Sequence, residues 1–397
     1  MELRASVRPS ASAKIPNLCL GRSGTDSLKA IRPDRRYTQR RNWLPIYPLL
    51  PLQMWMKEML DWAKYSKSFK REAHKAGYDD QYIEKCLNYA KCLSEKGLPI
   101  IYDQEHLAAL TGYNIEYLRR ASNAPNLFYR RFKIPKKSRG FGEISEPLPS
   151  LKEIQQWILN NILYQCTVSK FAKAFKHQCS IRDNARFHRG QRSVLSLDIK
   201  NFFSSIPTSR VFTFFNNCGY SKEVVTMLTN LCTSNNALPQ GAPTSPALSN
   251  LLSMRMDKRL SKYALKRKLR YTRYADDLTF SGECDVGSII RIVSTVLKDD
   301  GLQLNTNKTH LMRPCSRQVV TGIIVNKKMQ APREIRRNLR QDIYYIEKYG
   351  LDSHMQATGR TRAGYINHLR GIANFILFVN SKDRDAKHAI EVIADIT

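Results

Sequence analysis

The chain has 397 residues, 42% of them hydrophobic and 10% aromatic, and its 65 Lys and Arg against 34 Asp and Glu give a formal net charge of +31. This hydrophobic content excludes an intrinsically disordered protein, and the length suffices for two or three domains. The charge indicates a polyanionic partner. Because no segment is apolar enough to span a bilayer, we expect that partner to be nucleic acid and expect no membrane association.

Nine cysteines are scattered along the chain, and none belongs to a Cys-x-x-Cys pair. An odd number of cysteines also cannot pair completely within one chain. The pattern predicts reduced thiols in a cytoplasmic protein, with neither a zinc site nor a disulfide framework.

Residues 1–48 differ in composition from the rest of the chain. They are rich in Arg, Ser and Pro and show no helical or strand periodicity, so we predict a basic, disordered segment. Two other interpretations stay open: an organelle transit peptide, or a misassigned start with translation beginning at Met54 or Met56. We assign no function to this segment.

A helical N-terminal region is predicted over residues 49–128. From Trp55 to Lys96, apolar residues recur at steps of three and four, which is the period of an amphipathic helix. A second helical stretch covers 106–121.

Three further elements follow in chain order: an extended basic segment over 129–139, a helix over 151–163 and a strand over 194–199. The strand is predicted because apolar and polar residues alternate and several are β-branched. Towards the C-terminus, apolar residues at helical spacing open a helical region: Ile335, Leu339, Ile343 and Ile346.

The most informative motif is Tyr274-Ala-Asp-Asp277, inside an alternating stretch from Arg270 to Ser281. Alternation on both sides of two adjacent acids predicts a β-hairpin with Asp276 and Asp277 at its turn. Two carboxylates on a turn in so basic a chain indicate bound cations, most simply a pair of Mg²⁺ ions serving phosphoryl transfer on a nucleic acid. A plain turn is the alternative interpretation of an isolated Asp-Asp pair.

Two-metal chemistry needs carboxylates from different segments, and Asp198 at the end of the predicted strand supplies a third. Its neighbour Ile199 offers a backbone carbonyl as a further ligand. Taken alone, Asp198 is also explained as a helix N-cap.

A basic stretch from Arg255 to Arg273 contains nine Lys and Arg against the single acid Asp257 and leads directly into the acid pair. We expect it to bind phosphate backbone beside the metal-bound phosphate. The alternative is a solvated helix face.

Gln240 and Gly241 lie between the two acidic segments, in the loop Leu238-Pro-Gln-Gly-Ala-Pro. Glycine allows the backbone to approach a base pair closely, and the Gln amide supplies hydrogen bonds. The order of acidic strand, Pro-Gln-Gly loop, Tyr-Ala-Asp-Asp hairpin and the later Leu304–Thr309 segment resembles the reverse transcriptases over about residues 98–375.

That resemblance implies an α+β fold of the right-hand polymerase type, which the helical N-terminal region precedes. Fingers and palm are expected over 129–325, with an antiparallel sheet that carries the acids. A helical, RNA-binding thumb is expected over 326–397. The resemblance also implies that Asp198, Asp276 and Asp277 are catalytic and that, with Ile199, they bind two Mg²⁺ ions.

The nucleotide-binding residues that the resemblance implies are Lys136 and Arg139 in the fingers, Phe203 as a steric gate against a ribose 2′-OH, Gln240 and Gly241 at the incoming nucleotide, and Lys308 near its triphosphate. One position departs from the family. Glu143 precedes Ile144 where a basic residue is usual, so the fingers assignment depends on Arg139 as a substitute.

Two more motifs resemble the bacterial retron reverse transcriptases: Asn184-Ala-Arg-Phe-His188 and Val320-Thr321-Gly322. This resemblance implies an enzyme that copies part of its own structured non-coding RNA into single-stranded DNA. Synthesis would start at the 2′-OH of a guanosine and give a branched RNA–DNA product. The resemblance further implies dNTP substrates, a bacterial cytoplasm, and an anti-phage defence system with a separate toxin or effector protein.

We expect RNA binding by both motifs and by the basic region 327–372, where tyrosines are interleaved. The residues are Asn184, His188, Val320, Thr321, Gly322, Arg336, Arg337, Arg340 and Tyr344. Each assignment has a structural alternative. His188 could be a surface residue, Val320–Gly322 could be a strand that ends in a turn, and the basic region could be a helical bundle whose basic face merely follows a duplex. The functional alternatives are a group II intron-like or other reverse transcriptase and, from another class, a non-catalytic RNA-binding scaffold, against which the three acids argue.

Overall fold

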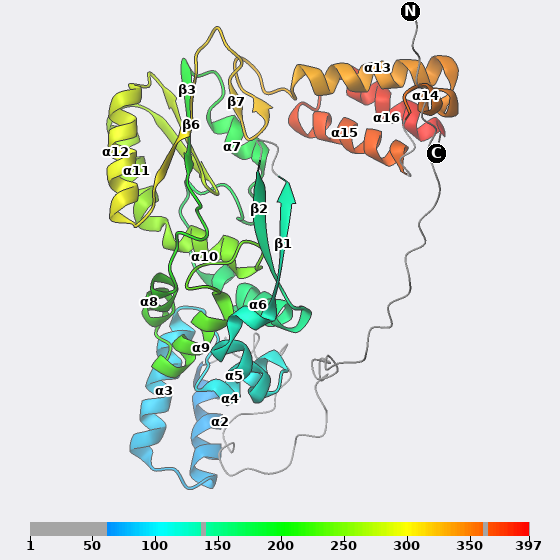
Figure 1. Cartoon of the computed structure of the whole chain (residues 1–397). Helices are drawn as coiled ribbons and strands as arrows, with labels where there is room; N and C mark the ends of the chain where they lie inside the picture. The colour runs from blue at the N-terminus through cyan, green and yellow to red at the C-terminus, as the bar shows by residue number, and fades with distance from the viewer. Residues whose placement is uncertain (1–61, 136–139, 360–363, 397) are drawn as a thin grey trace, which may run out of the picture. The chain divides into compact units, whose positions relative to one another are not determined.

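The computed structural model describes residues 62–135, 140–359 and 364–396 (Figure 1). Segment 1–48 and both alternative start positions lie outside the described residues. Helices and antiparallel sheets together build the described chain, which confirms the α+β class. No helix in the described part of the chain is long and apolar enough to cross a bilayer.

The described chain begins with four helices: α2 (Trp62–Lys75), α3 (Asp80–Glu95), α4 (Gln104–Thr111) and α5 (Ile115–Asn123). The single helix predicted over 106–121 is therefore two helices. Gly112 ends α4 with a φ of 75°, a left-handed conformation that glycine adopts without steric cost. The Asn114 side chain then accepts a hydrogen bond from the backbone N–H of Glu116 and starts α5.

A two-stranded antiparallel sheet follows, in which β1 (Tyr129–Pro135) pairs with β2 (Phe141–Pro147). The extended structure predicted from residue 129 is confirmed as far as Pro135. The short 3₁₀ helix η1 (Pro125–Phe128) leads into β1.

The central sheet has four antiparallel strands in the order β4-β5-β3-β6. Their bounds are β3 (Ser193–Ile199), β4 (Arg270–Tyr274), β5 (Asp277–Gly282) and β6 (Leu304–Met312). The predicted strand over 194–199 is confirmed as β3, which lies inside the sheet, and its Leu195 and Leu197 are fully buried. A strand paired on both edges is held more rigidly than an edge strand, so the residue at its end has a fixed position.

The remaining helices of this part of the chain are α6 (Pro149–Asn161), η2 (Leu163–Gln165), α7 (Ile181–Phe187), α8 (Thr208–Cys218), α9 (Lys222–Cys232), α10 (Thr244–Leu252), α11 (Met254–Lys266) and α12 (Val286–Asp299). Helices α11 and α12 lie along one side of the sheet (Figure 1). A single hydrophobic core joins the sheet to helices α3 to α6 and α8 to α12, with Phe215 and Phe280 fully buried in it.

A short hairpin of β7 (Val319–Val320) and β8 (Ile323–Ile324) precedes the last helices. These are α13 (Arg333–Tyr349), α14 (Leu351–Ala357), α15 (Tyr365–Val379) and α16 (Arg384–Ile396). They share a hydrophobic core of their own. The amphipathic helix predicted near the C-terminus is confirmed as α13, where Leu339, Ile343 and Ile346 are buried.

Candidate active site

The acid pair lies on a tight hairpin, as the alternation predicts. Tyr274 pairs with Asp277, and Ala275 and Asp276 form the two-residue turn between β4 and β5. Ala275 has a φ of 57°, in a region that residues with a Cβ rarely adopt, so the neighbouring structure must hold the turn. One such contact is the backbone N–H of Ile199, which donates to the Asp276 carbonyl at 3.0 Å.

Asp198 stands opposite Asp277 in the antiparallel pairing of β3 with β5. On its other side Asp198 pairs with Asn305 of β6, where the register shifts after Ser196. Such irregularities bend a strand and redirect a side chain. The sheet therefore brings the three predicted catalytic acids together at one end of neighbouring strands.

Burial and neighbouring negative charges make the ionised forms of Asp276 and Asp277 unfavourable without a cation. Burial, and next the charges of Asp276 and Asp198, raise the pKa of Asp277 to about 6. Burial and then Asp198 also raise the pKa of Asp276. Carboxylates with raised pKa values in one place favour a bound cation, which stabilises all of them in the charged form.

Lys308 supplies the positive charge nearest to these acids. Its ammonium donates to Asp198 Oδ1 at 2.8 Å, and Asn305 Nδ2 donates to the other carboxylate oxygen at 2.9 Å. The hydrogen bond to Asp198 is the main cause that raises the pKa of Lys308. In the described ranges, no three His, Cys, Asp or Glu side chains converge as a ready-made metal centre. The three carboxylates are nevertheless the hard oxygen donors that Mg²⁺ prefers.

A buried ion pair that the sequence did not reveal supports the turn. Arg273 and Asp257 are both fully buried, and the guanidinium donates to the two carboxylate oxygens at 2.9 and 2.8 Å. Arg273 Nη1 also donates to the Ala275 carbonyl at 3.1 Å, and this hydrogen bond stabilises the turn. The expectation that the whole stretch from Arg255 binds phosphate is wrong for Arg273, because this charge is neutralised inside the protein.

The Pro-Gln-Gly loop lies against β2. The backbone N–H of Ser145 donates to the Gln240 carbonyl at 2.8 Å, while the Gln240 side chain is exposed. Gly241 has a φ of 132°, and a Cβ there would stand 2.7 Å from the Ser145 carbonyl oxygen. Glycine is thus required where the loop meets the strand. The roles of Gln240 and Gly241 at a nucleotide stay predictions.

Other predicted nucleotide contacts are placed less directly. Phe203 is half-buried in the turn after β3, with its ring centroid 5.6 Å from that of Phe202. Ile199 continues the ladder by pairing with Leu304, and its carbonyl as a metal ligand stays a prediction. Lys136 and Arg139 lie outside the described residues.

The Asn-Ala-x-x-His motif is structural in this fold. Asn184 and His188 are fully buried. The Thr272 hydroxyl donates to Asn184 Oδ1 at 2.6 Å, and the His188 ring lies 2.7 Å from both the Thr272 and Ser281 hydroxyls. Burial also lowers the pKa of His188 to about 3, so the ring is neutral. The expectation that these two side chains contact RNA is corrected: they fasten α7 to the β4–β5 hairpin.

The Val-Thr-Gly motif forms the turn between β7 and β8. Thr321 and Gly322 have φ values of 47° and 79°, which fits the two-residue turn preferred in hairpins. Val320 is buried, and the Thr321 hydroxyl donates to the Ile181 carbonyl of α7 at 3.2 Å. Buried Val320 has no surface to offer RNA, which corrects that expectation. RNA binding by Thr321 and the exposed Gly322 stays a prediction.

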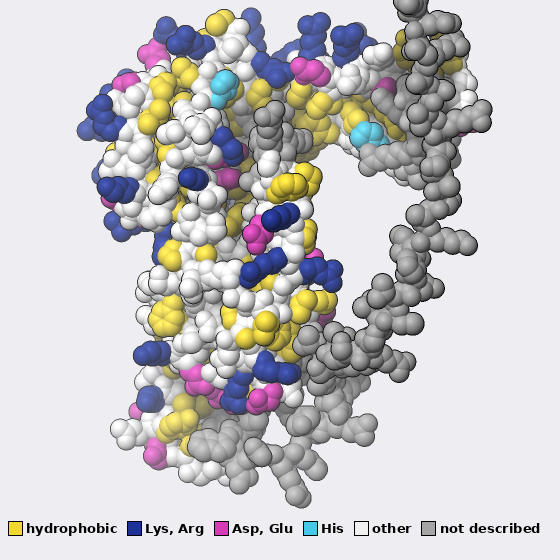
Figure 2. Space-filling view, viewed as in Figure 1, with side chains coloured by type: hydrophobic (Ala, Val, Ile, Leu, Met, Phe, Trp, Pro, Cys, Tyr) yellow, Lys and Arg dark blue, Asp and Glu magenta, His cyan; other side chains and the backbone are white. Residues whose placement is uncertain are grey.

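Helix α13 carries an exposed row of aromatic and basic side chains. Tyr344 is 53% exposed, and the Lys348 ammonium lies 5.8 Å from the centre of its ring. Arg337 is exposed, whereas Arg340 pairs with Asp385 at 3.1 Å. Arg336 donates to the Ala331 carbonyl. Lys and Arg side chains gather over α13 and over α11 and α12 in the view of Figure 2.

A family model of known proteins matches residues 134–337 and is described as reverse transcriptase (RNA-dependent DNA polymerase). The retron Ec86 reverse transcriptase of Escherichia coli is 33% identical over 73% of this chain and 88% of its own. The retron Mx65 reverse transcriptase of Myxococcus xanthus is 32% identical over 74% of this chain and 72% of its own. The chain belongs to the reverse transcriptase family and, within it, to the retron reverse transcriptases.

Among solved structures, telomerase from Candida albicans aligns over 68% of this chain and 63% of that one, with a TM-score of 0.41 and 11% identity. That likeness is too low to support an inference about function. The enzyme class therefore rests on the sequence relatives, and the site on the geometry described above.

Proposed function

We propose that Asp198, Asp276 and Asp277 are the catalytic carboxylates of this reverse transcriptase and that they hold two Mg²⁺ ions together with the Ile199 carbonyl. The observation that carries the proposal is the pairing of Asp198 with Asp277 across β3 and β5, beside the turn that contains Asp276. Bound Mg²⁺ supplies charge neutralisation for the attacking hydroxyl and for the leaving pyrophosphate.

Lys308 has two roles in this proposal. In the metal-free site it neutralises Asp198, but 59% of its side chain is exposed, so the ammonium is free to turn away. Once the acids hold cations, Lys308 faces the triphosphate of the incoming dNTP. Exposed Gln240 contacts that nucleotide, beside Gly241, and the fingers residues Lys136 and Arg139 grip its phosphates.

Phe203 is proposed as the steric gate against ribonucleotides. Replacing it with Ala should improve the use of ribonucleotides relative to deoxynucleotides by at least about tenfold, because a ribose 2′-OH would then have room. The measurement is the ratio of kcat/KM for ATP and dATP on one template. Phe378→Ala, which removes an exposed aromatic side chain from α15, is the matched control and should leave the ratio unchanged. Unchanged discrimination in the Phe203 variant would place the gate elsewhere.

For the whole reaction we propose retron DNA synthesis. The enzyme binds a cognate structured non-coding RNA, copies part of it into single-stranded DNA, and starts from a guanosine 2′-OH, so that the product is branched. Its membership among retron reverse transcriptases supports this proposal. The proposed fold is a right hand, with fingers and palm over 129–325 and a thumb over 326–397 whose exposed Tyr344 and basic residues contact RNA.

The test uses RNA transcribed from the DNA that flanks the gene, supplied with dNTPs and Mg²⁺. We expect DNA that stays covalently joined to its RNA and that a 2′,5′-debranching enzyme releases. Efficient synthesis from any annealed DNA primer, with no branched product, would favour a group II intron-like activity instead. RNA binding without any synthesis would favour the scaffold alternative.

The proposed setting is a bacterial cytoplasm and an anti-phage defence system, in which the enzyme and its RNA–DNA product restrain a separate effector protein. Bacterial retron relatives support this setting. The proposal requires that a protein encoded beside this gene co-elute with the enzyme only when the RNA–DNA product is present.

A further inference from the structure

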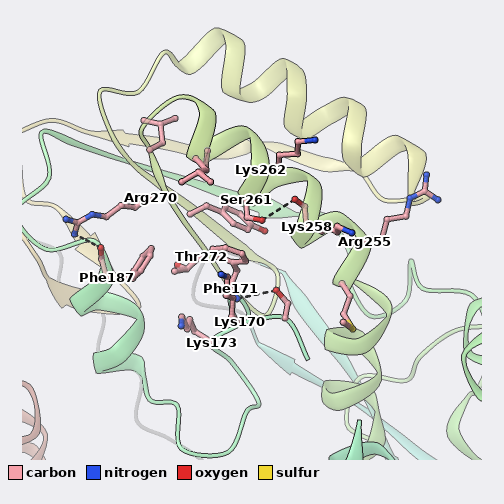
Figure 3. Close-up of a pocket in the computed structure, with 16 residues that line it drawn as sticks. Lys170, Phe171, Lys173, Phe187, Arg255, Lys258, Ser261, Lys262, Arg270 and Thr272 are labelled. Atoms are coloured by element: carbon pink, nitrogen blue, oxygen red, sulfur yellow. Dashed lines mark hydrogen bonds between the residues drawn. The ribbon is translucent and has the colours of Figure 1, made fainter. Parts of the chain in front are cut away.

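A cavity of 1170 Å³ lies beside the central sheet, away from the acid pair. It is bounded by α11, by β4, by the segment 169–173 and by the end of α7 (Figure 3). None of the three proposed catalytic acids lines it. Asp276 and Asp277 stand at the turn that follows β4, whereas the cavity is lined by the first three residues of that strand, Arg270 to Thr272.

The cavity is strongly basic. Its lining includes six basic side chains and no acidic one: Lys170, Lys173, Arg255, Lys258, Lys262 and Arg270. No carboxylate in the described part of the chain forms an ion pair with any of the six. Two nearby basic residues that do not line the cavity do form ion pairs: Arg259 pairs with Asp299, and Arg273 pairs with Asp257. Six basic side chains without an ion pair among the described residues thus share the lining of one cavity.

The helical spacing of α11 explains this sorting. Arg255, Lys258 and Lys262 follow one another at steps of three and four, which places them on one face of the helix. The opposite face carries Met256 and Leu260, which are buried in the core. In Figure 3 the labelled side chains of the segment 169–173 lie on one side of the cavity and those of α11 on the other, with the ends of Arg255 and Lys262 extending away from Phe187 in this view.

Aromatic rings lie between these charges. Phe187 is 41% exposed, and the Lys173 ammonium lies 5.9 Å from the centre of its ring. Lys170 lies 5.3 Å from the centre of the Phe171 ring. A ring next to an ammonium offers a base a stacking surface and offers its phosphate a counter-charge. Paired bases in a duplex are already stacked, so this arrangement suits unpaired nucleotides.

The buried retron motif holds one wall of the cavity in place. Asn184 and His188 bind the Thr272 hydroxyl, and Thr272 lines the cavity. Phe187 lies between them in the sequence, and Arg270 Nη1 donates to its carbonyl at 2.8 Å. Buried Asn184 and His188 therefore hold the exposed Phe187 ring at the cavity without touching a ligand themselves.

We propose that this cavity binds an unpaired segment of RNA, with bases against Phe187 and phosphates on Lys258 and Lys262. It would be a second nucleic-acid site, separate from the catalytic acids. This inference rests on the proposed function, because it assigns the cognate RNA a surface outside the polymerase site. Met254 and Leu265 are also exposed at the cavity, so an acidic protein is the competing occupant that the experiment must separate.

The experiment measures binding of a fluorescent single-stranded RNA of about ten nucleotides to the full chain. Unlabelled template–primer duplex with Ca²⁺ saturates the polymerase site first. Lys258→Ala/Lys262→Ala should weaken binding by about tenfold and lower the salt slope by about 1.4, which corresponds to two lost phosphate contacts. Phe187→Ala should weaken binding by about fivefold or more.

The matched control is Arg291→Ala/Lys298→Ala, which removes the same charge from exposed positions of α12 outside the cavity. It should bind RNA like the unmodified chain, and every variant should still extend an annealed DNA primer. If both double variants weakened RNA binding equally, the effect would come from net charge and not from the cavity, and the proposal would be overturned. The proposal would also be overturned if a polyglutamate probe bound the unmodified chain more tightly than the RNA did and bound the Lys258→Ala/Lys262→Ala variant more weakly.

These outcomes separate the two proposals. RNA binding that is unchanged in Lys258→Ala/Lys262→Ala, with DNA synthesis intact, overturns the role of the cavity alone. DNA synthesis that is absent from the unmodified chain, with the expected pattern of RNA binding, overturns the proposed function and leaves the RNA-binding site standing.

Discussion

Replacing Asp277 with Asn should reduce DNA synthesis by about a thousandfold or more while leaving RNA binding nearly unchanged. The loss is large because a metal ligand supplies several kcal/mol of transition-state stabilisation, and about 1.4 kcal/mol corresponds to a factor of ten. The measurement is single-turnover dNTP incorporation on one primed template. Asp352→Asn, at an exposed position of α14, is the control and should be as active as the unmodified enzyme.

The same variant should be more stable than the unmodified chain when no divalent cation is present. Burial and the two neighbouring acids raise the pKa of Asp277 from 3.8 to about 6. A raised pKa in the folded state contributes stability that is fully present below the unfolded value and is lost as the pH rises through about 6. At pH 7.5 in EDTA, the ionised carboxylate therefore destabilises the fold, and Asn removes that effect.

Thermal unfolding in EDTA and in Mg²⁺ checks this reasoning without any activity assay. We expect the unmodified chain to gain thermal stability from Mg²⁺, because a bound cation stabilises the folded state. The Asp277→Asn variant should have a higher unfolding temperature than the unmodified chain in EDTA, and Mg²⁺ should raise that temperature by less. Unchanged DNA synthesis in Asp277→Asn, or an equal gain from Mg²⁺, would contradict the assignment of Asp277 to the metals.

Local patterns predicted the elements that position the acids. Strand β3, the hairpin around Asp276 and helix α13 all follow from periods of two or about 3.6 along short stretches, which depend on neighbouring residues alone. The break between α4 and α5 was missed because one glycine outweighed a helical pattern on both sides. A left-handed residue inside a periodic stretch leaves little trace in the periodicity.

The sequence could not show which polar residues are buried. Arg273 belongs to a run of basic residues that reads as a solvated or phosphate-binding face, and His188 reads as a residue of a basic loop. Their burial depends on contacts with Asp257, Thr272 and Ser281, which the fold brings near from other elements. Charge and spacing alone do not encode such pairings. An acid alone among nine basic residues, as Asp257 is, is the one signal that could have drawn attention to the buried ion pair.

Arg273→Met should lower the stability of the folded chain by about 3–5 kcal/mol, because it leaves the Asp257 carboxylate buried without its partner. The shift of the urea denaturation midpoint measures this loss. Arg259, on the same helix as Asp257, forms a partly exposed pair with Asp299 of α12, and Arg259→Met should cost no more than about 1 kcal/mol. Arg273→Lys should not restore stability fully, since an ammonium cannot reproduce the two parallel hydrogen bonds of a guanidinium.

The double variant Asp257→Asn/Arg273→Met separates stability from positioning. In the unmodified chain the Tyr271 hydroxyl donates a hydrogen bond to Asp257 at 2.9 Å. The double variant removes both buried charges, and the Asn side-chain oxygen at position 257 still accepts this hydrogen bond. Much of the lost stability should therefore return. DNA synthesis should stay about 10- to 100-fold below that of the unmodified enzyme, because the hydrogen bond from Arg273 to the Ala275 carbonyl is lost. If synthesis recovers together with stability, Arg273 serves the fold alone. If it stays low in a stable protein, the ion pair positions the turn that carries Asp276.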